Sequence, residues 1–531
     1  MVSHMNIKKL LENIFYELDS DTRTATVVGL SSMPPDNIII PSSICYKEKT
    51  YTVTAIGEDA FHGKWIKSVR IPNSIVTINS GAFSFCNQLS SVVLPSSITE
   101  IADRVFEYCN SITALSIPDN IISIGNHAFD CCRSLREIVL PENVTTIGDS
   151  AFHSCTSLES IKIPNSVVSI GDSVFSACLS LKSIHIPTSV RKIGKGVFSR
   201  CKKLVNISLP EHIETFSAVI NYESDGFFSE CASLQSITIP SGVIGDYAFK
   251  NCVSLTSVTL GAGVTKIEND AFKGCSNLKE VEFRCEKLES IGSRAFENCS
   301  SLESISIPKS ITRIDSSSFN GTKLYNDANN WKNNVLYIGD CLIQAKKTIT
   351  GNFHIIEGTR LIAANAFSDC HELEDIYIPQ TVVNIGTYAF FWTKLYKNEA
   401  NWINNALYIN DCLIDTKANK IPKEYSVEKA TRLIADSAFS SCRDLEYITI
   451  PDSVMHVGKH CFMRFFNLKE IRISSTMKMH LLQNGLEDYQ DLIVTEANDE
   501  NSVITIKNKQ YTISELEKLI ELAEEFRSSK R

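Results

Sequence analysis

Cysteines are the residues of this chain best suited to chemistry, because a thiolate can ligate a metal, attack an electrophile or form a disulfide. The chain has 531 residues and 18 cysteines. Twelve of them share one context, three residues after a phenylalanine: Cys86, Cys109, Cys132, Cys155, Cys178, Cys201, Cys231, Cys252, Cys275, Cys299, Cys370 and Cys442. Equivalent thiols in a repeat would stack in a row and offer no unique pairs. We therefore expect a ladder of reduced thiols, each able to donate a weak hydrogen bond to a backbone carbonyl.

The remaining candidates for chemistry lack the partners that a catalytic or metal site needs. His456 and His460 have the spacing of a zinc helix but lie on a predicted strand and turn, without the glutamate of that helix. Cys131, next to Cys132, and Cys461 have no partner motif and are expected to be ordinary buried thiols. No CxxC pair, Walker loop, GxSxG or GxGxxG motif occurs in the sequence. We expect no catalytic, cofactor-binding or metal-binding residues, and no enzyme.

A repeated phrase of 23 residues, written three times between Cys132 and Cys201, positions the cysteines. Its phenylalanine recurs along the chain at Phe61, Phe83, Phe106, Phe129, Phe152, Phe175, Phe198, Phe228, Phe249, Phe272, Phe296, Phe319, Phe367, Phe390, Phe439 and Phe462. Such a period is typical of a solenoid, because one repeat cannot bury its apolar face without neighbours on both sides. We expect one continuous, mostly β stack rather than several globular domains.

Each repeat predicts two strands and a turn. The segment from Leu158 to Ile163 alternates as a strand whose isoleucines point inward, and stacked copies would make a parallel sheet. The proline that follows, Pro164 in this copy, would end the pairing because it has no N–H group. The next half-repeat predicts a short second strand, then a turn that leads to a phenylalanine in the corner of the core. A glycine after the second strand, such as Gly148, indicates a position where a positive φ is tolerated but not required.

Both ends of the stack need caps, because an open end exposes apolar core and unpaired strand edges. Residues 1–52 are predicted to form an N-terminal cap with a short helix from residue 6 to about 16 and hairpins over 14–29 and 37–56. The solenoid is predicted over residues 53–473. Residues 474–531 are predicted to form a C-terminal cap with a strand at 492–495, a hairpin of 503–506 with 510–513, and a terminal helix from Ser514.

The repeat is irregular at three places. Residues 213–231 carry extra length and are expected to bulge as a loop, either neutral or binding. Double-length coils are expected near 320–366 and 391–438, because two similar segments there carry a threonine at the ladder position, a tryptophan and a strand-like LYIGDCLI or LYINDCLI. Three tryptophans lie in this zone, Trp331, Trp392 and Trp402. They fit either a local core or a contact surface.

The full phrase, C-x-x-L-x-x-I-x-I-P-x-x-V-x-x-I-G-x-x-A-F, resembles the leucine-rich repeat of BspA-like surface proteins of oral and gut bacteria and some parasitic protists, also described from treponemes. The likeness covers about residues 37–473. The resemblance implies a curved, right-handed solenoid with parallel strands and a role in adhesion or protein binding. It brings no catalytic residues, and the sequence shows no signal peptide, anchor or sorting tail of a surface protein.

Composition and charge exclude several classes of partner. Hydrophobic residues make up 43% of the chain and the net charge is −9, without a cluster of Lys and Arg. A nucleic-acid or anionic-membrane surface needs such a cluster, so neither partner is expected. No apolar run of 18 residues occurs, so we expect no membrane span. The start of the sequence favours the cytosol and the family resemblance favours the surface or secretion, which leaves the localisation open.

The side chains that point outward from the main sheet are the best candidates for binding a protein. Lys162 and His185 lie in this column, and Tyr377 and Tyr447 lie close to the double-length coils. Together with Trp392 they are the predicted contact residues, although solvated strand positions would look the same. We expect a non-catalytic protein-binding scaffold whose partner and oligomeric state are open. The alternative is a cytosolic structural or assembly scaffold.

Overall fold

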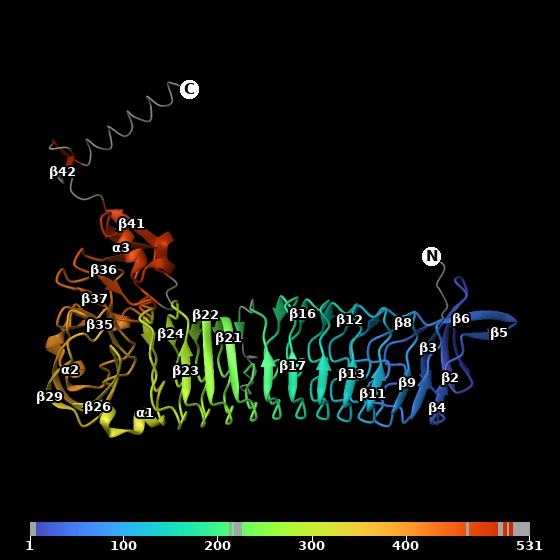
Figure 1. Ribbon diagram of the computed structural model, residues 1–531. Coiled ribbons are helices and arrows are strands. Elements are labelled where there is room, and N and C mark those ends of the chain that lie inside the picture. Colours follow the sequence, from blue (N-terminus) through green and yellow to red (C-terminus); the bar gives the residue numbers. More distant parts are fainter. Residues whose placement is uncertain are drawn as a thin grey trace, which may run out of the picture. The chain divides into compact units, whose positions relative to one another are not determined.

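The computed structural model describes residues 7–211, 215–216, 226–462, 467–496, 503–506 and 509–512 (Figure 1). They form a mostly β solenoid of stacked parallel strands, as predicted. The chain divides into two compact units: unit 1 comprises Met1–Ile311 and Ser316–Asn330, and unit 2 comprises Thr312–Asp315 and Trp331–Arg531. The division into two units falls at the first double-length coil, where antiparallel strands interrupt the parallel repeat.

The N-terminal cap is a sheet in the order β1 (Ile7–Leu11), β2 (Ile14–Asp19), β3 (Thr24–Leu30), β6 (Lys49–Ile56), β5 (Ser43–Tyr46). The helix predicted over residues 6–16 is wrong, because β1 and β2 form an antiparallel hairpin there. Its turn is Glu12 and Asn13, both with positive φ, which suits a two-residue hairpin. Ile14, Tyr16 and Leu18 are buried at every second position, so the period is that of a strand. In the second predicted hairpin only β5 and β6 pair with each other, because β4 (Asn37–Ile39) joins the repeat strands.

The first strands of the repeats are short and lie side by side along unit 1 (Figure 1). After β4 they are β7 (Ser68–Arg70), β9 (Ser91–Val93), β11 (Ala114–Ser116), β13 (Glu137–Val139), β15 (Ser160–Lys162), β17 (Ser183–His185), β19 (Asn206–Ser208), β21 (Ser236–Ile244), β22 (Ser257–Ile267) and β23 (Glu280–Phe283). Most end two residues before the repeat proline, as β15 does before Pro164. Pro240 is an exception inside β21, where the register with β22 shifts and no ladder bond from that residue is needed.

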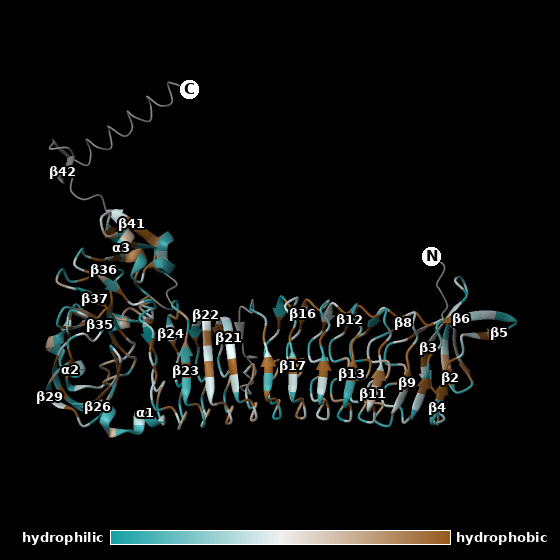
Figure 2. Cartoon of the chain, viewed as in Figure 1, coloured by the Kyte–Doolittle hydropathy of each residue, from teal (hydrophilic) through white to brown (hydrophobic). Residues whose placement is uncertain are grey.

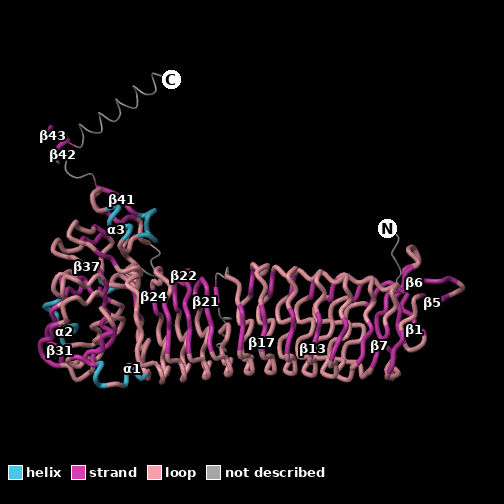
Figure 3. Tube along the Cα trace, in the orientation of Figure 1, coloured by secondary structure: helices cyan, strands magenta, loops and turns pink. Residues whose placement is uncertain are grey.

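The second strands have two residues each apart from the long β21 and β22, and turns and loops make up most of each coil (Figure 3). In unit 1 they are β8 (Thr77–Ile78), β10 (Glu100–Ile101), β12 (Ser123–Ile124), β14 (Thr146–Ile147), β16 (Ser169–Ile170), β18 (Lys192–Ile193), β20 (Thr215–Phe216) and β24 (Ser290–Ile291). Strands β10, β12, β14, β16 and β18 form one parallel sheet in chain order. Hydrophobic residues alternate with hydrophilic ones along these coils (Figure 2).

Stacked phenylalanine rings fill the core of unit 1. The rings of Phe61, Phe83, Phe106, Phe129, Phe152, Phe175, Phe198, Phe228, Phe249, Phe272, Phe296 and Phe319 follow one another with centroids 4.9–5.8 Å apart. All of them are fully buried. The rings are near-parallel because the period places each at the same height in its coil. The predicted corner phenylalanine is confirmed.

The cysteine ladder runs beside the phenylalanines. Ten thiols donate a hydrogen bond to the carbonyl of a phenylalanine in the preceding coil, as Cys178 does to Phe152 O at 3.2 Å. This confirms the predicted thiol-to-carbonyl bonds. All 18 cysteines are free, and all but Cys45 are buried.

Thiol titration tests the ladder. In the native protein we expect one thiol, Cys45, to react rapidly with an aromatic disulfide reagent, because reaction needs an accessible thiolate. After unfolding in denaturant without reductant, we expect all 18 thiols to react. A Cys45→Ser variant should lose the fast phase and leave the slow one unchanged. A count well below 18 in the unfolded chain would show stable disulfides instead of a ladder.

Glycine occurs after the second strand for a different physical reason from the backbone conformation that the sequence suggested. Gly125, Gly148 and Gly171 have no positive φ, but a Cβ atom at each would lie within 2.4–2.8 Å of the preceding coil. Close approach, and not conformation, therefore requires glycine. The residue that follows continues the contact, because its side chain accepts a hydrogen bond from the next coil: Asp149 N donates to Asn126 Oδ1 at 2.8 Å. Positive φ instead occurs two residues after the glycine, as at Ser150 (φ 54).

Unit 2 contains most of the first double-length coil and all of the second. Its strands are β25 (Arg313–Ile314), β26 (Trp331–Lys332), β27 (Val335–Ile338), β28 (Cys341–Ala345), β29 (Thr350–His354), β30 (Leu361–Ile362), β31 (Glu372–Tyr377), β32 (Asn384–Ile385), β33 (Trp402–Ile403), β34 (Ala406–Ile409), β35 (Cys412–Thr416), β36 (Glu424–Ser426), β37 (Leu433–Ile434), β38 (Tyr447–Thr449), β39 (His456–Val457), β40 (Glu470–Ser474), β41 (Ile493–Glu496), β42 (Val503–Ile506) and β43 (Lys509–Thr512). Its 3-10 helices are η2 (Glu399–Asn401), η3 (Ala418–Lys420) and η4 (Glu487–Leu492), and its α-helices are α2 (Lys394–Lys397) and α3 (Lys478–Gln483). Unit 1 ends with α1 (Lys323–Asn326) and η1 (Ala328–Asn330).

The strand-like LYIGDCLI and LYINDCLI segments are hairpins, not single strands. β27 pairs with β28, and β34 with β35, in antiparallel register. The turns contain Gly339 and Asn410, both with positive φ, which asparagine tolerates better than other side chains do. Thr322 and Thr393 replace the ladder cysteine because each caps a short helix, accepting a hydrogen bond from Tyr325 N and Tyr396 N.

The C-terminal part adds elements that the sequence analysis left unassigned. Helix α3 and the 3-10 helix η4 precede β41, which pairs in parallel with β40 and extends the array. The strand predicted at 492–495 and the hairpin of β42 with β43 are confirmed. The terminal helix predicted from Ser514 and most of the loop predicted over 213–231 lie outside the described residues. Among the helices that are described, none has the length and apolarity needed to cross a membrane.

Candidate functional site

Metal-ligating side chains gather in unit 1 at the turn that follows the core phenylalanine. Asp130 and Cys131 follow Phe129, and His153 follows Phe152 one repeat later. The backbone holds these two coils together, because Cys131 N donates to His153 O at 2.8 Å. Cys131 directly precedes the ladder cysteine Cys132 and has a positive φ of 58°. The residues that precede the ladder cysteine in the two neighbouring coils also have a positive φ. The period of the solenoid thus brings Asp130 and His153 side by side.

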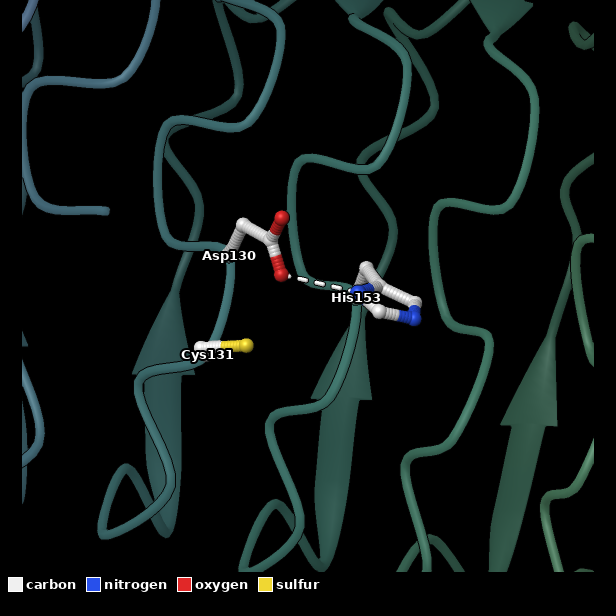
Figure 4. Close-up of side chains that lie close together, drawn as sticks. All are labelled: Asp130, Cys131 and His153. Atoms are coloured by element: carbon white, nitrogen blue, oxygen red, sulfur yellow. Dashed lines mark hydrogen bonds and ion pairs between the residues drawn. The ribbon is translucent and has the colours of Figure 1, made fainter. Parts of the chain in front are cut away.

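One carboxylate joins two histidines in this cluster. His153 Nδ1 lies 2.8 Å from Asp130 Oδ1, and His127 Nδ1 lies 3.0 Å from Asp130 Oδ2. The ligand atoms of Asp130, Cys131 and His153 all lie within 4.8 Å of one another, and so do those of Glu107, His127 and Asp130. The side chains of Asp130 and Cys131 extend from one coil toward the next, which carries His153, and the His153 ring extends onward from that coil (Figure 4). The arrangement offers oxygen, sulfur and nitrogen donors at one place.

The electrostatics of the cluster follow from burial and hydrogen bonds. The Asp130 side chain is only 11% exposed; burial acts to raise its pKa, but hydrogen bonds from His153 and His127 outweigh burial and lower the pKa. Burial and the neighbouring Asp130 raise the pKa of the Cys131 thiol. Burial also raises the pKa of Glu107. Hydrogen bonds therefore favour the ionised form of the Asp130 carboxyl, whereas burial favours the protonated form of the Cys131 thiol.

A second feature of unit 1 is the column of side chains that point outward from the first strands. We call this set, Ile39, Arg70, Val93, Ser116, Val139, Lys162, His185 and Ser208, the outward column. Strand pairing places neighbouring members opposite each other in three groups: Ile39, Arg70 and Val93; Ser116, Val139 and Lys162; and His185 and Ser208. Three of its members are large aliphatic residues with high exposure: Ile39 (72%), Val93 (55%) and Val139 (75%). Exposed aliphatic groups in register form a patch that a partner could cover.

A third feature is a row of exposed aromatic residues at the first coils. The rings of Phe85 and Tyr108 stack with centroids 4.5 Å apart, and the His62 ring lies 5.2 Å from Phe85. Trp65 is 76% exposed and lines a small pocket with His62 and Phe85. These residues form an aromatic surface on the turns after the core phenylalanine in the first coils. Asp130 lies on the equivalent turn of a later coil.

The five predicted contact residues lie in both units, two in unit 1 and three in unit 2. Lys162 and His185 are exposed members of the outward column, and the Lys162 ammonium pairs with Glu142 Oε1 at 2.6 Å. Tyr377 ends β31, where its hydroxyl donates to Glu357 Oε1 at 3.2 Å.

The remaining two predicted contact residues, Tyr447 and Trp392, lie in unit 2, as Tyr377 does, and both contact side chains of the same chain. Arg472 lies over the Tyr447 ring at 5.0 Å. Trp392 is half-exposed at the turn before α2, with the Lys397 ammonium 4.9 Å from its ring centroid. Trp392 therefore does not lie on the sheet face. Trp331 and Trp402 are partly buried, and Trp402 Nε1 donates to Tyr396 O at 2.9 Å.

The sequence analysis missed the cluster around Asp130 because it searched for short-range motifs. Asp130 and His153 are one full period apart, so only their shared position in the repeat brings them together. Reading the residue after each core phenylalanine as a column gives Glu107, Asp130 and His153 in consecutive coils. This column, with Cys131 beside it, is the signal that would have identified the cluster.

Comparisons with known proteins agree with the fold. A family model described as "BspA type Leucine rich repeat region (6 copies)" matches residues 54–155, 123–224, 221–350, 326–423 and 410–520. A leucine-rich repeat protein from Bacteroides ovatus is 27% identical with a TM-score of 0.51, over 71% of this chain and 94% of that chain. No curated protein matches the chain.

Two further solved structures are similar over shorter parts of the chain. A leucine-rich repeat protein from T. pallidum is 27% identical, covers 38% of this chain and 92% of its own, and has a TM-score of 0.34. A leucine-rich cell surface protein from Faecalibacterium prausnitzii is 24% identical, covers 53% of this chain and 96% of its own, and has a TM-score of 0.32.

Proposed function

We propose that this chain, which belongs to the BspA-type leucine-rich repeat family, is a non-catalytic scaffold that binds a protein partner through the outward column of unit 1. The observation that carries the proposal is the exposure of three aliphatic residues, Ile39, Val93 and Val139, at alternate members of that column, with Arg70 and Ser116 between them. A solvated sheet face has no need of such side chains, whereas a protein partner would remove them from water at about 25 cal/mol per Å² of apolar area.

The surroundings of these residues favour a protein rather than a small molecule. Successive strands lie about 4.8 Å apart, so the column presents an extended face and not a closed pocket. Arg70, Lys162 and His185 supply polar and cationic groups between and beyond the aliphatic ones, and Glu142 adds an acidic group beside Lys162. An apolar strip with a polar rim is the usual composition of a protein interface. Within this proposal, adhesion to a host protein is the specific role that we infer.

The test is capture of purified host matrix proteins by the full chain, measured by surface binding at several concentrations. We expect saturable binding of at least one of them. Val139→Glu should weaken that binding more than tenfold, because it places an unpaired carboxylate in the apolar strip. Val168→Glu is the matched control, since Val168 is a 45% exposed valine that precedes β16 on the second-strand side.

Two results would contradict the proposal. If Val139→Glu and Val168→Glu bind as the natural chain does, the outward column is not the contact face. If no host protein binds saturably while light scattering shows concentration-dependent assembly of the chain, the assembly scaffold replaces the adhesion role. Circular dichroism of both variants would verify that each remains folded.

A further inference from the structure

We propose that the turn column of unit 1 binds a divalent transition-metal ion of the zinc class through Asp130, Cys131 and His153. The ligands are Asp130 Oδ1, Cys131 Sγ and an imidazole nitrogen of His153, which already lie within 4.8 Å of one another. Zinc bonds of about 2.0–2.3 Å set tetrahedral ligands about 3.3–3.7 Å apart. Small side-chain rotations therefore suffice to bring the three atoms to bonding distance, and the backbone between the coils stays in place.

The donor set selects the class of metal. A thiolate and an imidazole are ligands of zinc and its neighbours in the transition series, whereas calcium and magnesium take oxygen ligands. Three protein ligands leave a fourth position for water or an external group. His153 is 35% exposed, which gives an ion a path from solvent. When the ion binds, the Cys131 thiol releases its proton to solvent and the metal ion takes the place of that proton on the sulfur.

Neighbouring groups orient the ligands. His127 Nδ1 holds Asp130 Oδ2 at 3.0 Å, which leaves Asp130 Oδ1 directed at His153. The second ring nitrogen of His153 lies 3.4 Å from Ser154 Oγ, so a proton at Nε2 can be donated to that hydroxyl while Nδ1 binds the metal. Carboxylate and hydroxyl partners of this kind fix ring orientation and tautomer at metal sites. His127 is thus a positioning residue.

Packing does not require these residues. At the position of Asp130 and His153, later coils of unit 1 carry Ser176, Ser199 and Ser229. Each serine directly follows the buried core phenylalanine of its own coil. At the position of Cys131, the next coils carry Ser154 and Ala177. The same fold is therefore built with small residues at both positions. Among the residues that the structure describes, three or more metal donors gather where Glu107, Asp130 and His153 follow one another.

Cobalt(II) provides a direct test, because a thiolate ligand gives a charge-transfer band and a tetrahedral site gives strong visible bands. The full chain, purified with reductant and then freed of metal with a chelator, is titrated with Co²⁺ and with Zn²⁺ in competition. All proteins carry Cys45→Ser, which removes the one exposed thiol. We expect one Co²⁺ per chain with a thiolate band that Zn²⁺ abolishes.

Variants assign the ligands. Cys131→Ser should remove the thiolate band, and His153→Gln should weaken binding at least tenfold. His127→Gln should weaken binding about tenfold or more but keep the thiolate band, as loss of an orienting partner does. His62→Gln is the matched control, because His62 occupies the same position of the repeat in the first coil. No Co²⁺ binding to a folded chain, or a band unchanged in Cys131→Ser, would overturn the proposal.

Discussion

Replacement of Phe175 by alanine is expected to lower the free energy of unfolding of unit 1 by about 3–5 kcal/mol. Phe175 is fully buried, and its ring stacks on Phe152 and Phe198 with centroids 5.8 and 5.7 Å away. The substitution leaves a cavity whose walls are two rings held by their own coils, so collapse around it is restricted. Lost ring contacts and lost apolar burial add in the same direction.

The measurement is urea unfolding of the full chain followed by circular dichroism, with hydrogen exchange of residues 152–201 to localise the change. Because unit 1 and unit 2 are separate compact units, the exchange data distinguish loosening of these coils from loss of the whole chain. Val168→Ala is the control, since that exposed side chain should change stability by no more than about 0.5 kcal/mol. A loss below about 1 kcal/mol for Phe175→Ala would mean that neighbouring rings close the gap.

The regular coils could be predicted from the sequence because each repeat solves the same packing problem in the same way. Isoleucines at alternate positions, a proline beyond the strand and a corner phenylalanine define a coil such as that of β15. Because the repeat period is constant, the phenylalanines of adjacent coils occupy equivalent positions. The stacking of their rings can therefore be inferred from the sequence. The recurring glycine after the second strand can also be recognised in the sequence, but the physical reason for glycine at this position cannot. A close approach between coils depends on the position of the preceding backbone, which the sequence does not display.

The failed predictions come from short segments whose local pattern fits two structures. Leu10, Leu11, Ile14 and Phe15 have helical spacing, but they lie on two strands separated by a turn at Glu12 and Asn13. A short apolar run does not distinguish helix from strand. LYINDCLI was correctly assigned as strand-like, but the turn at Asn410 that divides it into two strands was not predicted. The cluster around Asp130 was missed for another reason, because its members come from separate repeats and no short motif contains them.

Asp436 in unit 2 should make stability fall as pH rises from about 4 to about 6. Its side chain is buried, with 2% exposure, and burial raises its pKa to about 6, partly opposed by the charge of Arg313. The native state therefore binds this proton more tightly than the unfolded state does. Stability is largest below the unfolded pKa, near 4, and decreases until the pH exceeds the folded pKa. The difference of about two pH units corresponds to about 3 kcal/mol.

Asp436→Asn is expected to remove this loss. At pH 7 the variant should be more stable than the natural chain by up to about 3 kcal/mol, and at pH 4 the two should be nearly equal. Asparagine fits because the same position of the repeat is asparagine elsewhere: Asn269 Oδ1 accepts a hydrogen bond from Ser293 N at 2.9 Å. Urea unfolding of both proteins at pH 4, 5, 6 and 7 measures the difference.

The control for this experiment is Asp149→Asn, at the equivalent position of unit 1, where the side chain is exposed and accepts a hydrogen bond from Asp172 N at 2.8 Å. A substitution at this exposed side chain should change stability at pH 7 by no more than about 0.5 kcal/mol. Parallel pH profiles for Asp436→Asn and the natural chain would mean that the surroundings of Asp436 stabilise its carboxylate as well as water does in the unfolded chain. Since Asn384 Nδ2 approaches Asp436 Oδ2 at 3.5 Å and also donates to Thr312 O at 2.6 Å, an Asn384→Ala variant should deepen the loss of stability above pH 6 by removing a donor to the ionised form.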